Sequence, residues 1–264
     1  DPPFNTGVER KARLASGEER AQGTLAYSDR FGGADAFIEM LEPRLHAMRR
    51  CMSAQASLWL HLSHHTVHEA KLALDRVFGR EQFQGEVIWV PGNGGRRRTG
   101  PSVTHQTLLI YTKAGRMFWN DGDAALREPY AQTSQRMHFG ARDENGRAYR
   151  ERTIRGKTYR YYADIGRRIG SVWSDCPAMS ANTPLTRETT GYPTQKPEAL
   201  LERIVRAASI PGSSVLDPMC GSGTTVAVAT RLGRRALGID RSPLACDIAR
   251  KRIVASPQPT RGLY

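Results

Sequence analysis

Hydrophobic side chains recur along this chain with two spacings, and each spacing predicts a different element. Over residues 34–51 an apolar side chain returns every three or four positions, which is the period of an amphipathic helix. Residues 57–62, SLWLHL, form a short apolar run with the length of a buried strand. The same criteria predict four further helices, which run from Ser63 to Phe78, over 198–208, from Thr224 or Thr225 to Leu232 and over 243–253. They also predict strands over 86–90, over 103–112, up to Leu216 and over 235–239.

Strands and helices alternate in this pattern, and the alternation predicts an α/β fold in which helices flank a mostly parallel sheet. With 264 residues the chain is long enough for one large domain, or one domain with an insert, around a sizeable core. Residues 8–31 break the pattern because they are polar, charged and without periodicity. We expect a mobile loop there, either ordering on a partner or plainly disordered.

Near its carboxyl end the chain places glycines and acidic residues where they could hold a ligand. Asp217 ends one predicted strand, a loop with Gly221 and Gly223 follows, and Asp240 ends the next strand. Glycines allow a ligand to approach the backbone closely, and an acid after the second strand suits ribose hydroxyls. The loop lacks the lysine of a triphosphate-binding loop, and Val226 stands where a dinucleotide fingerprint has its third glycine. An ordinary helix-capping turn is the alternative.

The sequence begins with a short acidic loop that contains two prolines, DPPF. The prolines stiffen the loop, and the Asp1 carboxylate and the Pro2 carbonyl are hydrogen-bond acceptors. DPPF also resembles the (D/N/S)PP(Y/F) motif of amino-methylating DNA methyltransferases. The resemblance implies that the two acceptors bind the hydrogens of an exocyclic base amine and localise a lone pair that is otherwise delocalised into the ring. Phe4 would then offer an aromatic face to a base swung out of the duplex. Such a loop is expected at the carboxyl end of a central strand, so we expect a core strand before Asp1.

The charge of the chain is strongly positive and is concentrated in one region. Lysine and arginine number 39 against 26 aspartate and glutamate residues, a formal net charge of +13, which indicates a polyanionic partner. Residues 92–170 carry 16 of the basic and 7 of the acidic residues, interleaved with aromatic side chains. Because arginines bind phosphates and read guanine edges, we expect Arg96, Arg97 and Arg98 to contact nucleic acid. A solvated basic surface is the alternative.

The cysteine and histidine residues indicate neither a disulfide framework nor a metal site. The four cysteines lie far apart with no CxxC pair, as reduced thiols of a cytosolic protein do. His64 and His68 are one helical turn apart, but the glutamate of an HExxH motif is missing and no later ligand completes a set, so we expect no metal. No apolar run reaches the length of a membrane span, and no signal peptide opens the sequence.

Four features of the chain resemble, in their order, the motifs of beta-class DNA amino-methyltransferases. They are DPPF, the basic region, TQKP at residues 194–197 and DPMCGSGTT at residues 217–225. The resemblance covers nearly the whole chain and is weakest over residues 8–30 and 113–185. It implies a Rossmann-like sheet that binds S-adenosyl-L-methionine (AdoMet). The catalytic residues that it implies are Asp1, Pro2, Pro3 and Phe4.

The resemblance also implies which residues hold the cofactor. Asp217 and the backbone at Gly221 and Gly223 would lie beside the methionine moiety. Asp240 would bind the ribose hydroxyls, and Lys196 would pair with the cofactor carboxylate. The remaining cofactor-binding residues that it implies are Thr194, Pro218, Cys220, Ser222, Thr224 and Arg241.

A division of the chain and a set of partners follow from the same resemblance. Residues 1–91 would form the catalytic half, residues 92–185 a basic target-recognition insert with a core strand inside 103–112, and residues 186–264 the AdoMet-binding half. The substrate would be double-stranded DNA in a bacterial cytoplasm, with a second copy of the chain (a homodimer) and a cognate restriction endonuclease as further partners. A carboxylate at Asp1 favours adenine N6 over cytosine N4 as the target. An RNA methyltransferase and a catalytically silent DNA-binding protein are the alternatives from other classes.

Overall fold

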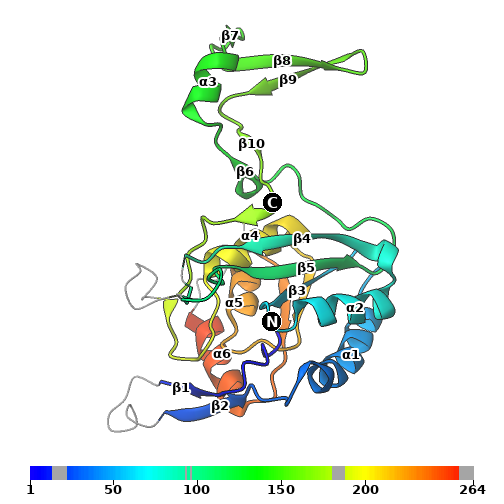
Figure 1. Ribbon diagram of the computed structural model, residues 1–264. Helices are drawn as coiled ribbons and strands as arrows, with labels where there is room; N and C mark the ends of the chain where they lie inside the picture. Colours follow the sequence, from blue (N-terminus) through cyan, green and yellow to red (C-terminus); the bar gives the residue numbers. More distant parts are fainter. Residues whose placement is uncertain (14–22, 93, 96, 180–187, 256–264) are drawn as a thin grey trace. The chain divides into compact units, whose positions relative to one another are not determined.

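The computed structural model describes residues 1–13, 23–92, 94–95, 97–179 and 188–255. The chain forms two compact units, and Figure 1 shows their elements in sequence colours. Unit 1 comprises Asp1–Trp119 and Ser171–Tyr264, and unit 2 comprises Asn120–Gly170. Unit 2 is therefore narrower than the predicted insert, whose flanking residues on both sides belong to unit 1.

The core of unit 1 contains a four-stranded mixed sheet with the order β11-β4-β5-β3. Strand β11 runs parallel to β4, while β4 and β3 both run antiparallel to β5. Pairing of β3 with β5 places Leu60 opposite Leu109 and Leu58 opposite Tyr111. This register presents the apolar side chains of both strands to the same face of the sheet. The elements are β3 (Ser57–Leu62), the 3₁₀ helix η2 (Arg80–Gln82), β4 (Phe83–Trp89), β5 (Gln106–Thr112) and β11 (Val172–Trp173).

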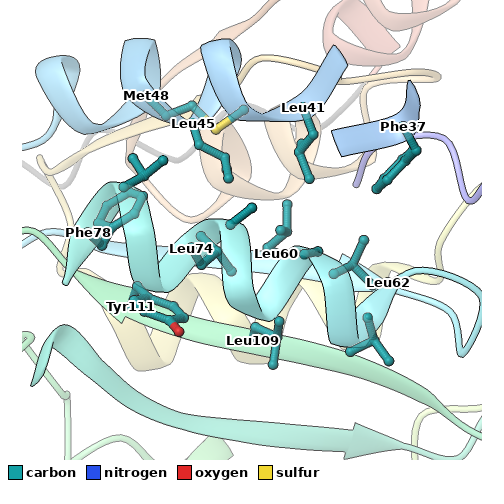
Figure 2. Packing of buried hydrophobic residues seen from close by; sticks show 14 residues of the cluster. Phe37, Leu41, Leu45, Met48, Leu60, Leu62, Leu74, Phe78, Leu109 and Tyr111 are labelled. Carbon is teal, nitrogen blue, oxygen red and sulfur yellow. The ribbon is translucent and has the colours of Figure 1, made fainter. Parts of the chain in front are cut away.

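Helices α1 (Ala34–Cys51) and α2 (Val67–Phe78) pack their apolar sides against this face (Figure 2). The bounds predicted for α1 are confirmed, and its buried side chains follow the helical period. Leu41 of α1 and Leu74 of α2 are fully buried in one cluster with leucines of β3 and β5. Burying a leucine stabilises a fold by roughly 1.5–3 kcal/mol. Helix α2 begins later than predicted, because Ser63 starts a turn that precedes it.

A parallel pair of strands in unit 1 holds the glycine-rich loop. Strand β12 (Ser214–Asp217) pairs with β13 (Arg235–Gly238), and α5 (Thr224–Arg231) connects the two. Gly223, with φ of 75°, is the N-cap residue of α5, and the helix begins at Thr224, one of the two predicted starts. A left-handed glycine already turns the chain into the helix there. The helices that pack against α5 are α4 (Glu198–Ala208) and α6 (Pro243–Ala255).

The expectation of a mobile loop over residues 8–31 is wrong, because that segment contains two paired strands. Strand β1 (Glu9–Ala12) runs antiparallel to β2 (Thr24–Ser28). Two alanines, one from each strand, are buried with Tyr192 in a small cluster. Short side chains among charged residues give no apolar period, and the sequence pattern therefore carried no strand signal. The residues between the two strands, 14–22, lie outside the described part.

Unit 2 is built on a three-stranded antiparallel sheet in which β8 lies between β7 and β9. Strands β8 and β9 form a hairpin closed by Arg155 and Gly156, and in Figure 1 this hairpin extends away from α3. A second, short ladder pairs β6 with β10. The elements are η3 (Ala124–Leu126), β6 (Arg127–Glu128), α3 (Gln132–His138), β7 (Ala141–Arg142), β8 (Ala148–Ile154), β9 (Lys157–Tyr162) and β10 (Arg167–Arg168).

The α/β fold class is confirmed, and the described strands pair both in parallel and in antiparallel orientation. Strand pairs β12–β13 and β11–β4 are parallel, whereas the remaining described pairs are antiparallel. The strand predicted inside residues 103–112 is β5, and it lies in the sheet of unit 1. Among the helices in the described ranges, none combines the length and the apolar composition that a membrane crossing requires.

Candidate active site

The DPPF loop brings an acid and an aromatic ring against two basic side chains from distant parts of the chain. The Asp1 carboxylate accepts a hydrogen bond from Lys196 Nζ at 2.7 Å, and its other oxygen lies 3.5 Å from His61 Nδ1. The centroid of the Phe4 ring lies 4.9 Å from Lys196 Nζ and 5.5 Å from the centroid of the His61 ring. Because the Asp1 side chain is still 30% exposed, it can receive a ligand.

A buried carboxylate holds the backbone that follows this motif. Asp29 is 1% exposed, and its oxygens accept the Asn5 N–H at 2.8 Å, the Thr6 N–H at 3.2 Å and the Thr6 hydroxyl hydrogen. Arg10 lies 3.5 Å from the same carboxylate and balances its charge. Asn5 is itself left-handed, with φ of 55°. Hydrogen bonds to a charged acceptor are the stronger kind, so Asp29 fixes the conformation of the DPPF loop.

The second acid, Asp240, closes the glycine-rich loop. One of its carboxylate oxygens accepts the Gly221 N–H at 2.8 Å, and the other accepts the Ser242 N–H at 2.8 Å. At the end of β12, Asp217 accepts the Met219 N–H at 3.2 Å. A carboxylate offers about four lone-pair sites, so both acids are anchored by the loop and keep acceptor capacity for a ligand.

The glycines of this region serve the packing of helices as well as the turn. A Cβ on Gly223 would meet the Ala249 Cβ of α6 at 2.6 Å, and a Cβ on Gly238 would meet Val226 Cγ2 of α5 at 2.7 Å. Side chains at these two positions would overfill an already packed contact. Gly223 and Gly238 therefore let α5 lie close to α6 and to β13.

The TQKP segment is a braced turn. Gln195 Oε1 accepts the backbone N–H of Thr190 at 3.0 Å and its hydroxyl hydrogen at 2.8 Å. Thr194 has φ of 59°, which is rare for a β-branched residue, and its hydroxyl lies 2.9 Å from the Tyr27 hydroxyl. Strained residues persist where their surroundings hold them, and they cluster at functional sites. The turn places Lys196 Nζ at Asp1 and Phe4 of the DPPF loop.

Burial shifts the ionisation of the groups around the two loops. It lowers the pKa of Lys196 to about 7, and it holds the pKa of His61 well below its ordinary value of 6.5. His61 is therefore neutral at pH 7. Burial, together with the neighbouring acids, raises the pKa of Cys220 to about 12, so this residue stays a thiol and is not a nucleophile. The groups around Asp1 therefore suit a site in which Asp1 accepts hydrogen bonds from a ligand and positions it.

A cavity of about 1770 Å³ connects the two loops. Typical ligand pockets have roughly 300–1,000 Å³, so this cavity has room for a nucleotide-sized cofactor together with a base. Apolar side chains from β3, β12 and α4 form much of the remaining wall. The predicted site residues that line the cavity are Asp1, Pro2, Pro3, Phe4, Thr194, Lys196, Asp217, Pro218, Cys220, Gly221, Ser222, Thr224, Asp240 and Arg241. Gly223, also predicted to bind the cofactor, lies instead against α6.

Two residues of the predicted arginine cluster, Arg97 and Arg98, are not among the residues that line this cavity. Arg97 and Arg98 are exposed in the loop before β5, where the Arg97 N–H donates to the Ser102 hydroxyl at 3.0 Å. Arg96 lies outside the described residues. Contact of these arginines with DNA stays a prediction. In the described ranges no three histidine, cysteine or acidic side chains converge in a way that could hold a metal.

Three residues of the site escaped the sequence patterns. His61 ends close to Asp1, Asp29 holds the DPPF loop, and the Tyr192 ring forms a wall beside Gly221, where a Cβ would lie 3.3 Å from Tyr192 Cε1. For His61 a signal existed, because a polar residue near the carboxyl end of a predicted strand often faces a ligand site. Asp29 and Tyr192 lie in segments without periodicity and gave none.

The β12–α5–β13 unit and the DPPF loop line one cavity, which agrees with the Rossmann-like methyltransferase fold that the resemblance implies. The chain belongs to the DNA methylase family N6_N4_Mtase, whose sequence profile matches residues 1–251. It is 27% identical over 300 residues to the type II methyltransferase M.EcaI of Enterobacter cloacae, covering 98% of this chain and 64% of that protein. It is 28% identical over 242 residues to the DNA adenine methyltransferase YhdJ of Escherichia coli, covering 91% and 69%. The chain thus spans about two thirds of the length of these relatives.

Solved structures share the fold at low sequence identity. The cytosine-N4-specific PvuII DNA methyltransferase has a TM-score of 0.58 at 12% identity, covering 94% of this chain and 81% of that chain. A DNA modification methylase of Thermus thermophilus, complexed with S-adenosyl-L-methionine, has a TM-score of 0.50 at 21% identity, covering 84% and 78%. At these identities the likeness establishes the fold.

Proposed function

We propose that this chain transfers a methyl group from AdoMet to the N6 amine of an adenine in double-stranded DNA. The observation that carries the proposal is the single cavity lined both by the DPPF loop and by the glycine-rich loop with its two acids. A cofactor held at one loop can then face a base held at the other. AdoMet, when bound, supplies a methyl group that is electrophilic because it is attached to a sulfonium.

The protein's own part in the reaction is hydrogen bonding and positioning. The Asp1 carboxylate accepts one hydrogen of the amine and the Pro2 carbonyl accepts the other, which favours a pyramidal nitrogen with a localised lone pair. Lys196 Nζ, at 2.7 Å from Asp1, fixes the orientation of that carboxylate, and Phe4 offers a stacking face. Holding two reactants in an ideal geometry can supply roughly 7–11 kcal/mol of the barrier reduction.

The residues around the glycine-rich loop fit AdoMet chemically. Asp240 retains lone pairs for ribose hydroxyls, since its two loop hydrogen bonds use about half of its capacity. In its protonated form, which predominates below the pKa of about 7, Lys196 has three donors and gives two of them to Asp1 and to Thr194 O, at 2.7 and 2.9 Å. Its third donor remains for the cofactor carboxylate. Lys196 would then link the cofactor to the catalytic acid.

Adenine is the proposed target because of the residue at position 1. A carboxylate is a stronger acceptor than the serine hydroxyl that often stands at this position in the cytosine enzymes that the motif resembles. The relative YhdJ is named as an adenine methyltransferase. Cytosine N4 carries the same kind of conjugated amine, so it is the second candidate.

A methyl-transfer assay tests this proposal. The purified protein is incubated with tritiated AdoMet and with duplex DNA, RNA or no nucleic acid, and the methylated DNA is digested to nucleosides for mass spectrometry. We expect N6-methyladenine from DNA alone. Asp1→Ala should bind AdoMet normally and lose methyl transfer, whereas the control Glu39→Ala, on an exposed position of α1, should retain both. Detection of N4-methylcytosine in place of N6-methyladenine would change the proposed target atom to cytosine N4. Label in RNA, or methyl transfer by the Asp1→Ala protein, would overturn the mechanism.

The proposed reaction sets expectations for partners. Double-stranded DNA suits the net charge of +13. A homodimer, a cognate restriction endonuclease and a cytoplasmic location are expectations from the resemblance to restriction-modification enzymes. Light scattering would decide the first of these, because a dimer has twice the 29.3 kDa of the single chain.

A further inference from the structure

The β8–β9 hairpin of unit 2 carries a different set of side chains on each face. Alternation along the strands places cross-strand neighbours on the same side. We call one side the paired face, and its members are Tyr149, Glu151, Thr153, Thr158, Arg160 and Tyr162. We call the outer part of the other side the open face, and its members are Arg152, Ile154, Lys157 and Tyr159.

On and beside the paired face the cations have acidic partners. Arg160 lies 3.0 Å from Glu151 and stacks over the Tyr149 ring with its guanidinium carbon 4.1 Å from the ring centroid. Arg147, just before β8, lies 2.9 Å from Asp164. The paired face therefore neutralises its own charge within the hairpin.

The open face presents cations without such partners. Arg152 and Lys157 are exposed, and within the described residues neither takes part in an ion pair. Tyr159 is 40% exposed and Ile154 is 42% exposed, so apolar surface lies between the two charges. Closer to the base of the hairpin the same side is covered, because Arg150 packs 5.1 Å from the centroid of the Phe139 ring. The outer half of this side is thus cationic and exposed.

The turn that closes the hairpin adds a third cation at an unfavourable position. Arg155 has φ of 51° and Gly156 has φ of 76°, the geometry of a two-residue turn that favours asparagine followed by glycine. A long side chain with a Cβ is disfavoured in this left-handed conformation. Strain at an exposed tip indicates that the side chain has a use other than stability.

We propose that the open face and Arg155 enter a groove of double-stranded DNA. The inference rests on the proposed function and names the surface that holds the substrate. A two-stranded ribbon fits the major groove, which is about 12 Å wide, while strands lie about 4.8 Å apart. Arg152, Arg155 and Lys157 bind phosphates or guanine edges there, and Tyr159 and Ile154 contact thymine methyl groups.

The geometry favours DNA over the other polyanions that three cations could bind. The major groove of an RNA duplex is deep and narrow and excludes side chains, so a ribbon does not read it. A single strand would be bound by stacked bases on aromatic faces, whereas the open face carries one aromatic ring, Tyr159. Duplex RNA and single-stranded DNA therefore serve as competing probes in the test.

Binding of a 40-base-pair duplex is measured over a series of salt concentrations. Arg152→Ser with Lys157→Ser should weaken binding and reduce the slope of log K against log salt by up to about 0.9 for each lost phosphate contact. The matched single variants are Arg152→Ser and Arg160→Ser, which remove one cation each from opposite faces of the same hairpin. We expect the first to lower the slope and the second to leave it unchanged. Exchanging the two cations, Arg152→Lys with Lys157→Arg, keeps the charge and should keep the slope.

An unchanged slope in the double variant, or equal effects of Arg152→Ser and Arg160→Ser, would overturn this inference. So would parent protein that binds duplex RNA or single-stranded DNA as tightly as duplex DNA. Circular dichroism of each variant checks that unit 2 is folded. If the serine variants unfold, Arg152→Gln with Lys157→Gln, which removes both charges and keeps long side chains, takes their place and should lower the slope in the same way. Failure of the proposed function looks different: the parent would then bind DNA through the open face and transfer no methyl group to it.

Discussion

Replacing Gly223 by alanine should destabilise the protein more than the same replacement at Gly233, and the difference should measure a steric clash. The two glycines flank α5 and have nearly equal left-handed φ values of 75° and 78°. A Cβ on Gly223 would lie 2.6 Å from the Ala249 Cβ and 3.0 Å from its Cα. A Cβ on Gly233 would meet Pro211 Cβ at an ordinary 3.7 Å. The two substitutions therefore share the backbone strain and differ in the clash.

The magnitude follows from these two contributions. A left-handed conformation costs a residue with a Cβ roughly 1–2 kcal/mol, and Gly233→Ala should lower the free energy of unfolding by that amount. Overfilling a packed contact costs roughly 1–3 kcal/mol more. The Ala249 Cα belongs to the backbone of α6 and cannot rotate away, so the clash at Gly223 must move a helix. We expect Gly223→Ala to lose roughly 2–5 kcal/mol in total.

Urea denaturation followed by tryptophan fluorescence gives both free energies, provided that the denaturant slope is the same for the two variants. Gly223→Ala should also weaken AdoMet binding in a calorimeter, because α5 begins directly after the glycine-rich loop. Gly233→Ala should bind AdoMet like the parent. Equal losses of stability in the two variants would refute the packing role that we assign to Gly223.

Three further predictions concern the site itself. Asp29→Ala leaves two backbone N–H donors without an acceptor, at a cost of roughly 1–3 kcal/mol each, and should lower both the free energy of unfolding and kcat. Asp29→Asn keeps one acceptor oxygen and should lower both quantities less. Equal losses in the two variants would contradict the role of the carboxylate. Asp240→Ala should weaken AdoMet binding by roughly 1.5–3 kcal/mol in calorimetry. The control Asp247→Ala, at an exposed position of α6, should leave the affinity unchanged. An unaltered affinity in Asp240→Ala would mean that Asp240 does not bind the ribose. Lys196 loses its proton near pH 7 in the folded protein but only near pH 10.4 in the unfolded chain, so the free energy of unfolding should rise with pH from about 7 to about 8.5. Above about pH 8.5 the thiol proton that folded Cys220 retains opposes the rise. Lys196→Met should reduce the slope between about pH 7 and 8.5, and an unchanged slope in that variant would contradict the assignment to Lys196.

Elements with a long and regular period were predictable from the sequence. The apolar spacing of α1 and α4 gave the bounds of both helices, because each buries one continuous stripe of side chains. The glycine-rich loop was also predictable, since the order of strand, acid, glycines, helix and strand is local. The residues that line the cavity include nearly all of those the motifs implied. Local order along the chain fixes these features without knowledge of what packs against them.

Features that depend on distant partners were not predictable. Nothing nearby in sequence distinguishes Asp29 from the other acidic residues, because its burial results from the backbone donors that it satisfies in the DPPF loop. Among four neighbouring histidines, only a three-dimensional view shows that His61 lies at Asp1. Unit 2 is shorter than the charged region, since an excess of charge marks a surface and its partner and need not end where a compact unit ends.

The hydrogen bond between Lys196 and Asp1 joins residues 195 positions apart, and this separation bears on how the protein folds. Closing a flexible loop of that length costs roughly 4–5 kcal/mol of chain entropy, which a single contact does not offset. The cluster around Asp1 can form only once the core between α1 and β3 and the β12–α5–β13 unit have each ordered their part of the chain. Contacts between residues so far apart in sequence slow folding. In a refolding experiment, the proposed methyl-transfer activity should therefore return after the burial of the tryptophans and the formation of the helices.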